Sequence, residues 1–469
     1  MLRLTWVQPE DLLGHELRQA AQDGREPWAV AARWKAAGGC EAPPRAGASP
    51  QRASRYLRLL ADDLLDELAD LPGKLTDDEP TDLERIRSRC PHWPTRPTDA
   101  HARTTAHSPT PGPAPTPTSL EAAWLGRAVG CLLGKPVEKL PLDAIRALAR
   151  STGNWPLTSY FTARGVPEAL LEAHPWNRRS ATTSLAENID GMPEDDDLNY
   201  PLLNLLLLQR HGRNFTTTDV ARLWLDELPA GRTFTAERVA LRNLLAGIEP
   251  PHTARHRNPF REWIGALIRA DVHGWTNPGD PAAAAEQAHR DATLTHTANG
   301  VYAAMFTAAT IAAATTGTHD IHACLHTGLT VIPPRSRLAK AITHAVQLAE
   351  EQPDFDTVVD ELHATHQAYH WVHAIPNTAL IAAALTHADG DFTGSICRAV
   401  SAGLDTDSNG ATAGGIAGLL AGDPAALPDR WTAPLKNRLA TSVADLGGVG
   451  FDTLAHLTWS LTHREASRP

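Results

Sequence analysis

Apolar side chains in the first part of the chain recur with helical spacing. Five leucines lie three or four residues apart, which places them on one face of a helix over residues 54–71: Leu57, Leu60, Leu64, Leu68 and Leu71. A second helix is predicted over residues 9–22, because a proline stands in its first turn and a glycine just past its end. Residues 1–104 are therefore predicted to form a small helical region, and no pattern in them indicates chemistry.

The pattern changes after this region. Residues 105–119 alternate proline with small polar residues, which favours an extended linker. Residues 120–466 carry Ala- and Leu-rich helical patterns separated by Pro and Gly. The predicted helices cover residues 120–132, 198–209, 217–227, 299–314, 357–370, 377–387, 392–402 and 411–421. We find no sustained β-alternation, fixed repeat or heptad run, so we predict an all-α, compact multi-helix domain over 120–466.

Composition narrows the class of protein. The 469-residue chain has a formal net charge of −11, which disfavours general nucleic-acid binding but leaves small anionic substrates open. Its five cysteines are scattered and form no Cys-x-x-Cys pair, which fits a reducing compartment better than a disulfide framework. The first residues lack the apolar run of a signal peptide, and no stretch is long and apolar enough to span a bilayer. We therefore expect a cytoplasmic protein without membrane contact; the oligomeric state stays open.

The first candidate for chemistry is an acidic run before an apolar segment. Glu194 is followed by three aspartates, and an apolar run over 202–208 comes directly afterwards. Adjacent carboxylates repel one another, so such a cluster is stable in open solvent or around a cation, and hard cations such as Mg²⁺ and Mn²⁺ prefer oxygen ligands. The alternative is helix capping, because acids at a helix N-terminus interact favourably with its dipole. Both interpretations stay open for this segment alone.

A second acidic segment precedes an Ala- and Gly-rich helix. Asp405, Asp407 and the Ser408 hydroxyl are hard oxygen donors at the start of the helix predicted over 411–421. The segment is not an EF-hand loop, because Ile416 stands where that loop needs its final Glu. A turn with a cap is the alternative. Taken together, the two segments suggest a site for one or two divalent ions, which an all-α fold can assemble from distant helix starts.

A glycine-rich helix contributes a third candidate. Gly126, Gly130 and Gly134 are four residues apart, which indicates close helix packing. Glu138 follows a proline that ends this helix, so its carboxylate can project into a cleft. A phosphate-binding loop is not indicated, because Pro136 replaces the Ser or Thr of that motif and the earlier Gly is missing.

Histidines over residues 357–373 form a fourth pattern. Their spacings of three and four place them on one helical face: His363, His366, His370 and His373. A polar helix face is the simpler interpretation, and a metal site is the alternative. His373 is a separate case, because it lies where the helix breaks before Pro376 and can face a cleft.

These segments together resemble the ADP-ribosylglycohydrolase family, which includes the dinitrogenase reductase-activating glycohydrolases. Four blocks occur in the family's order over roughly residues 120–425: 126–138, 195–197, 299–305 and 403–408. They are similar to the family's Gly-x-x-x-Gly-Asp-x-x-Gly-x-x-x-Glu, Thr-Asp-Asp-Thr, Asn-Gly-x-x-Met and Gly-Gly-Asp-Thr-Asp-Thr elements. The resemblance implies an all-α fold with two divalent metals, usually Mg²⁺ or Mn²⁺. It also implies hydrolysis of the glycosidic bond at C1 of an ADP-ribosyl ribose, on a small molecule or a protein.

The resemblance also implies roles for individual residues. Glu138, near the anomeric carbon, and Asp196 are the implied catalytic residues. The implied metal ligands are Asp195, Asp196, Asp405, Asp407 and Ser408, and a shift of register by one makes Asp196 and Asp197 the ligand pair of the first segment. The implied substrate-binding residues are Asn299, Gly300, Met305, His373, Asn377 and Gly403.

The chain departs from the family pattern at several positions. Cys131 stands where the family has Asp, Glu194 and Asp197 replace its two Thr, and Phe306 follows Met where many members have Arg. These departures leave the substrate open within ribosyl and nucleotide compounds. Two other functions use the same residues: a metal-dependent nucleotide phosphohydrolase, and a non-catalytic relative that binds ADP-ribose or a nucleotide.

Overall fold

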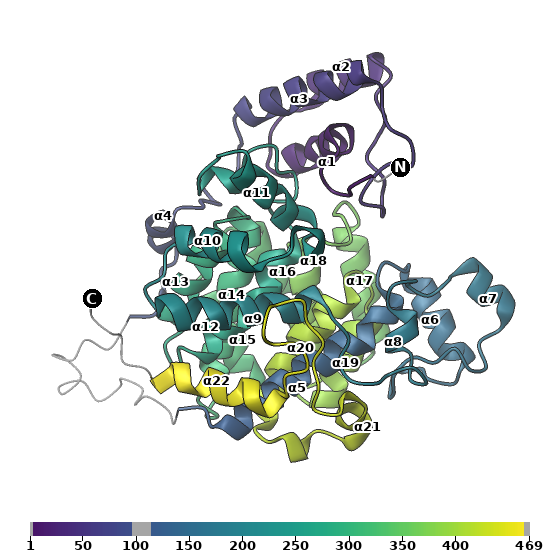
Figure 1. The fold of residues 1–469 in the computed structure, drawn as a ribbon, viewed down its shortest axis with the longest axis vertical. Helices are drawn as coiled ribbons and strands as arrows, with labels where there is room; N and C mark the ends of the chain where they lie inside the picture. Colours follow the sequence, from purple (N-terminus) through teal and green to yellow (C-terminus); the bar gives the residue numbers. More distant parts are fainter. Residues whose placement is uncertain (1–2, 96–113, 464–469) are drawn as a thin grey trace.

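The computed structural model describes residues 3–95 and 114–463, and within them the fold is all-α, which confirms the predicted class (Figure 1). Twenty-two α-helices alternate with loops and short 3-10 helices, and the described residues contain no strand, only isolated β-bridges such as the one between Met192 and Leu439. Among these helices, none is long and apolar enough to cross a membrane.

Eighteen of the helices form a body after residue 114. They are α5 (Pro117–Gly134), α6 (Leu142–Ser151), α7 (Glu168–Ala173), α8 (Ala181–Ser184), α9 (Asp196–His211), α10 (Thr217–Glu227), α11 (Thr235–Leu245), α12 (Asp271–Trp275), α13 (Pro281–Ala292), α14 (Ala298–Ala314), α15 (Ile321–Leu329), α16 (Arg337–Glu351), α17 (Phe355–His366), α18 (Ala374–His387), α19 (Phe392–Ser401), α20 (Thr406–Ala421), α21 (Asp429–Thr432) and α22 (Phe451–His463). The inner ones, α5, α14, α18 and α20, are buried along nearly their whole length.

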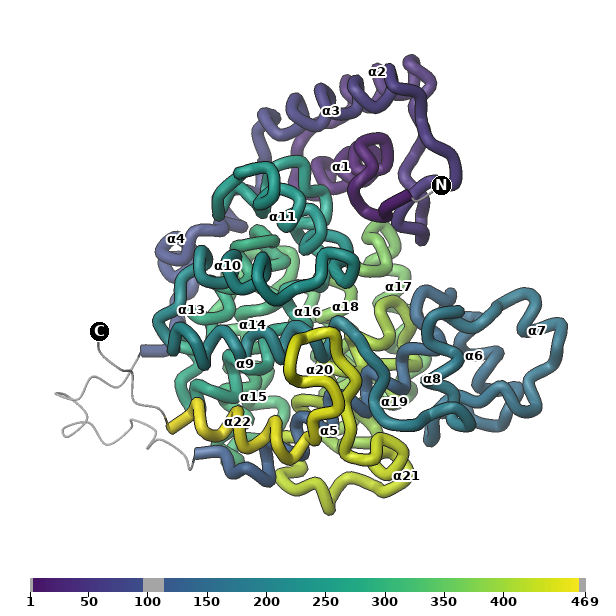
Figure 2. The backbone as a smooth tube through the Cα atoms, in the orientation of Figure 1, coloured from purple at the N-terminus to yellow at the C-terminus, as the bar shows by residue number. Residues whose placement is uncertain are grey.

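The remaining helices belong to the N-terminal region. They are α1 (Pro9–Gln22), α2 (Trp28–Ala36), α3 (Arg55–Asp70) and α4 (Leu83–Arg89). The helix predicted over 54–71 is α3; it begins where the Ser54 hydroxyl accepts a hydrogen bond from the amide of Leu57, and its leucine face is turned toward the core. The first three helices lie together at one end of the molecule, whereas α4 follows the chain toward α13, where Arg87 pairs with Glu286 (Figure 2).

Helices α5 and α20 pack at unusually close range, as the glycine spacing predicts. A Cβ atom at Gly130 would lie 1.8 Å from the carbonyl oxygen of Gly410, and one at Gly126 would lie 2.1 Å from that of Gly414. Only glycine on both helices allows this approach. The contact continues to Gly134, whose carbonyl accepts a hydrogen bond of 2.8 Å from the Thr406 hydroxyl, so the end of α5 lies against the start of α20.

Most predicted helix boundaries differ from the structure by a few residues, and the helix predicted over 357–370 ends as α17 at His366. The predicted 105–119 linker lies mostly in residues 96–113, outside the described residues, and α5 begins at Pro117, slightly before the predicted domain start. The helix predicted over 411–421 begins at Thr406 instead, because Asp405 occupies the N-cap position and the next residues complete the first turn. The acidic segment therefore lies inside that turn.

The N-terminal region and the body meet at a buried set of ion pairs, here called the N-terminal junction. Arg261 of the body contacts Glu16 of α1 at 2.6 Å, and Arg337 contacts Glu79 at 2.7 Å and Glu262 at 2.9 Å. Both Glu262 oxygens receive further hydrogen bonds, one of them at 2.8 Å from Gln19 of α1. The junction thus joins the two parts through charged groups that are compensated within the protein.

Candidate metal centre

The first acidic segment forms the start of α9. Asp195 is the N-cap residue, and its Oδ1 accepts a hydrogen bond of 3.0 Å from the amide of Asp197. Asp196 and Asp197 occupy the first turn. Helix capping therefore uses one oxygen of Asp195. The carboxylates of Asp196 and Asp197 take no part in capping and are available for other contacts.

The second acidic segment forms the start of α20, and a tight turn leads into it. Gly403 and Leu404 both have positive φ angles, 79° and 63°, so the chain reverses just before Asp405. The amide of Asp405 donates a hydrogen bond of 3.2 Å to Oδ1 of Asn377. This contact fixes the Asp405 backbone, while Asp407 and Ser408 follow in the first turn.

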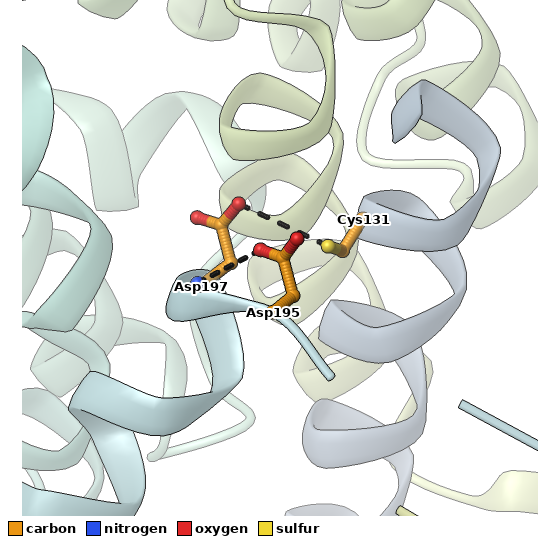
Figure 3. A group of neighbouring side chains, drawn as sticks. All are labelled: Cys131, Asp195 and Asp197. Carbon is orange, nitrogen blue, oxygen red and sulfur yellow. Dashed lines mark hydrogen bonds between the residues drawn. The ribbon is translucent and has the colours of Figure 1, made fainter. Parts of the chain in front are cut away.

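The close packing of α5 on α20 brings the two segments together. Cys131 from α5 faces the carboxylates at the start of α9, with its sulfur 3.8 Å from Oδ2 of Asp197 (Figure 3). Ser408 of α20 reaches the same Asp197 oxygen at 3.4 Å. The structure therefore places residues from three helices around one buried cluster, here called the acidic centre.

The acidic centre has two halves. The first half consists of Cys131, Asp195 and Asp197, and the second consists of Glu138, Asp405 and Asp407. In each half, one ligand atom from every residue lies within 4.8 Å of the others, a spacing that suits a single cation.

Burial makes these carboxylates difficult to ionise. At the start of α9, burial and then the charges of nearby carboxylates raise the pKa of Asp196 and of Asp197 well above the usual range. At the start of α20, the same causes raise the pKa of Asp405 strongly and that of Asp407 to about 7. Negative charge is therefore in excess at this place in the fold.

Three cationic side chains contact the centre in the described part of the chain. Lys135 pairs with Asp195, Arg127 lies 3.6 Å from Asp197, and Lys139 lies 2.8 Å from Glu138. Burial opposes ionisation of Asp195, but the charge and hydrogen bond of Lys135 outweigh it and hold the pKa of this carboxyl below its usual value. Three cations face six carboxylates, namely Glu138, Asp195, Asp196, Asp197, Asp405 and Asp407, so internal compensation is incomplete.

The donor set fits a hard divalent cation. Carboxylate and hydroxyl oxygens predominate, and these are the ligands that Mg²⁺ and Mn²⁺ prefer. Oδ1 of Asp197 is buried and lacks a hydrogen-bond partner, so this oxygen has a lone pair available. The Cys131 thiol is the exception among the donors: burial and then the nearby carboxylates raise its pKa well above the usual value, which keeps it protonated.

The other residues predicted for substrate binding divide into two groups. Asn377 and Gly403 lie at the acidic centre, where they shape the turn before Asp405. The remaining four lie away from it. Asn299 donates to Glu79 and Glu262, and Gly300 packs against the carbonyl of Arg261; Met305 is fully buried in α14, and Nε2 of His373 lies 3.7 Å from Glu262.

The histidines predicted to share one helical face do not share a helix, because α17 ends at His366 and His370 and His373 lie between α17 and α18. Three of them line a cavity beside the centre. His363, His366 and His370 line a cavity of about 210 Å³, here called the aromatic cavity, together with Leu362, Gln367, Tyr369, Trp371, Pro376, Leu380 and Leu404. None of these histidines belongs to a group of described residues with metal-ligating spacing. Leu404 precedes Asp405, and the Trp371 ring lies 5.3 Å from Nζ of Lys139, so this cavity shares walls with the acidic centre.

Sequence reasoning missed the cations of the centre. Lys135 directly follows Gly134 at the end of α5, and nothing near it in sequence indicates its partner Asp195. Arg127 lies on α5, eight positions earlier, where a charged side chain among small and apolar ones signals a buried ion pair. This isolated charge is the feature of the sequence from which a buried ion pair could have been predicted.

Comparison with known proteins identifies the family to which the chain belongs. The family model described as ADP-ribosylglycohydrolase matches residues 116–463. The chain belongs to the ADP-ribosylglycohydrolase family. This match extends beyond the 120–425 segment that carries the sequence resemblance, and it confirms that resemblance. No curated protein matches the chain.

Among solved structures, one similar chain is titled "ADP-ribosylglycohydrolase-related protein complex". It has 22% sequence identity and a TM-score of 0.45, and the match covers 74% of this chain and 97% of that chain. The assignment of this ADP-ribosylglycohydrolase family member rests on the sequence model and not on that structure.

Proposed function

We propose that this protein is a metal-dependent hydrolase that cleaves the glycosidic bond at C1 of the ribose in an ADP-ribosyl or related ribosyl compound. The observation that carries the proposal is the convergence of two acidic helix starts, on α9 and α20, beside the carboxylate of Glu138. Membership in the family supports a glycohydrolase. The substrate we propose is an ADP-ribosylated small molecule or protein.

The family resemblance implies that Mg²⁺ or Mn²⁺ is held by residues from both helix starts. These implied ligands are Asp195, Asp196, Asp197, Asp405, Asp407 and Ser408, with Glu138 at the edge of the second half. When bound, such a cation supplies positive charge that orients the ribose hydroxyls and favours ionisation of water.

In this proposal Glu138 acts on the anomeric carbon, and its contacts support that role. Its Oε2 accepts a hydrogen bond of 2.6 Å from Asn177, and its Oε1 pairs with Lys139, so the carboxylate has a fixed orientation. Cleavage breaks the bond from C1 to the leaving group and leaves positive charge on the sugar ring, which a fixed carboxylate stabilises. Water then adds to C1 and its proton passes to a carboxylate of the centre.

The aromatic cavity supports a substrate with a flat ring. Its walls include Trp371 and Tyr369, and none of its lining residues is a carboxylate. Aromatic walls bind flat, apolar rings well. A nucleoside ring or an aromatic leaving group therefore fits this cavity.

The test is hydrolysis of a panel: ADP-ribosyl-arginine, O-acetyl-ADP-ribose, an ADP-ribosyl-serine peptide and NAD. Each is incubated with Mn²⁺ or Mg²⁺, or with EDTA, and free ADP-ribose is measured by mass. We expect metal-dependent release that Asp405→Asn abolishes. Asp391→Asn is the matched control, because Asp391 caps α19 outside the centre and Asn can accept the same hydrogen bond.

Other outcomes select the alternative functions. Release of phosphate instead of ADP-ribose would identify a phosphohydrolase. Absence of turnover on the whole panel by folded, metal-loaded protein would contradict hydrolysis of these compounds and favour a binding role.

A further inference from the structure

The two halves of the acidic centre differ in the cations that the protein itself provides. The first half has two carboxylates, Asp195 and Asp197, and each has a cationic partner. The second half has three carboxylates and one cationic partner. This difference bears on how many metal ions the centre can bind.

Both oxygens of Asp195 already have partners inside the protein. Its Oδ2 is paired with Nζ of Lys135, and its Oδ1 accepts the capping hydrogen bond from the Asp197 amide. The Lys135 side chain is only 8% exposed, and Nζ also lies 3.5 Å from the carbonyl oxygen of Glu194. A buried ammonium group therefore lies beside Asp195, where it repels a metal ion.

The other members of the first half are also unsuited to a second ion. Arg127 donates to the carbonyl of Asp197 at 2.8 Å, lies 3.6 Å from its Oδ1 and is fully buried. The third donor, Cys131, presents a thiol, and Mg²⁺ and Mn²⁺ bind sulfur poorly compared with oxygen. A divalent ion here would lie beside two fixed positive charges, which repel it.

The second half lacks this compensation. Among the described residues, neither Asp405 nor Asp407 has a lysine or arginine in ion-pair contact, and Lys139, the partner of Glu138, is 42% exposed, so solvent screens its charge more than that of Lys135. Three oxygen donors within 4.8 Å of one another can hold a hard cation there.

We propose that the centre binds a single divalent cation, in the second half, and that the Lys135 ammonium stands in the first half where a second ion would otherwise be required. This inference rests on the proposed function, since it assumes that the centre takes a divalent cation. It departs from the two-ion expectation that the family resemblance implies. Lys135 is thus a positioning residue that fixes Asp195 and supplies permanent positive charge.

The experiment counts ions directly. Metal-free protein is titrated with Mn²⁺, bound manganese is quantified by mass spectrometry after desalting, and the saturated protein is examined by electron paramagnetic resonance. We expect one Mn²⁺ per chain and the signal of an isolated ion. Two ions per chain with a spin-coupled signal would overturn the proposal and leave the proposed hydrolase function standing.

Variants test the role of Lys135. Lys135→Met keeps an unbranched side chain that is one atom shorter and removes its charge, so Asp195 becomes available and we expect two ions per chain with spin coupling. The matched control is Lys139→Met, which removes the neighbouring ammonium without freeing Asp195; we expect one ion per chain, bound more tightly. A single ion in Lys135→Met would overturn the role given to Lys135.

A second variant serves if Lys135→Met does not fold. Asp195→Asn keeps the cap, and we expect it to bind one Mn²⁺ with nearly unchanged affinity, because Asp195 is not a ligand in this proposal. Loss of the ion in Asp195→Asn would contradict the proposal. Absence of turnover by protein that holds one ion would count against the hydrolase function alone.

Discussion

The acidic centre and the N-terminal junction both bury several carboxylates, but they treat the charge in opposite ways. At the junction, burial works against ionisation of Glu262, yet Arg337 and His373 outweigh it and hold the pKa of this carboxyl well below its usual value. At the centre, burial and the charge of Asp407 raise the pKa of Asp405 well above its usual value. Buried carboxylates are therefore ionised at the junction, where cationic partners are close, and resist ionisation at the centre, where such partners are too few.

This difference separates a structural cluster from a functional one. A buried carboxylate that has an arginine partner and satisfied hydrogen bonds requires nothing from outside the protein. A group of carboxylates with too few partners destabilises the metal-free fold, and proteins retain such groups where they bind a ligand. The charges of the junction are compensated within the protein, whereas the centre has the excess negative charge that the proposed cation would balance.

Removal of the arginine at the junction should have the largest effect. Arg337→Met leaves Glu79 and Glu262 without their shared partner, and the loss of one member of a buried ion pair costs about 3–5 kcal/mol. The free energy of unfolding from urea titration measures this change. Arg33→Met is the matched control, because the pair of Arg33 with Glu67 lies in solvent and its loss should hardly change stability. Equal losses of unfolding free energy in both variants would mean that the buried ion pairs contribute no more to stability than the exposed pair.

Removal of a carboxylate at the centre should have the opposite sign. The pKa of Asp407 is raised from 3.8 to about 7 in the folded protein, so the stability of the metal-free fold falls as the pH rises between these two values, and the full cost is present at pH 8. Asp407→Asn should therefore stabilise metal-free protein by about 2 kcal/mol at pH 8. Thermal melts in EDTA measure the gain. With saturating Mn²⁺ the wild type should become the more stable of the two, because only its intact centre gains free energy from the ion. A destabilised Asp407→Asn in EDTA would contradict the excess of negative charge.

Mild acid should weaken the junction. Burial, with the nearby charge of Arg18, lowers the pKa of His15 from 6.5 to about 3 in the folded protein. For a histidine with a lowered folded pKa, the stabilising contribution is complete above the unfolded pKa and is lost as the pH falls below it. At pH 5.5 this costs about 1.4 kcal/mol relative to neutral pH.

The variant His15→Phe separates the effect of His15 protonation on stability from the effect of protonation at the acidic centre. The His15 ring packs against Phe260 and Trp263 of the body, so phenylalanine keeps the ring contact without the titration. The stability difference between wild type and variant, measured in EDTA at pH 7.5 and 5.5, should shift by this amount in favour of the variant. An unchanged difference would mean that His15 becomes protonated without cost.

The sequence anticipates much of this arrangement, for reasons that are local. The α3 leucine spacing, the glycine spacing of α5 and the two acidic helix starts each depend on a few adjacent residues, and all appear in the structure. The junction depends on distant partners: Arg261 and Glu16 are 245 positions apart, and Arg337 and Glu79 are 258 positions apart. Asn299 was assigned to substrate binding by resemblance, and nothing near it in sequence indicates that Glu79 would reach its side chain. Lys135 was missed because its partner, Asp195, lies on another helix.

The smallest expected effect concerns the connection between the two regions. Asn377 donates to the carbonyl of His373, whose ring lies beside Glu262 of the junction, and it accepts a hydrogen bond from the amide of Asp405 in the centre. Asn377→Ala leaves that amide unpaired, and a neutral hydrogen bond contributes about 1 kcal/mol, so Mn²⁺ affinity should fall about fivefold. Calorimetric titration measures the affinity. Thr378→Ala is the matched control on the same helix, because its hydroxyl donates only to the carbonyl of Ala374. If both variants weaken Mn²⁺ binding equally, the effect comes from α18 as a whole and the contact between Asn377 and Asp405 has no separate role in metal binding.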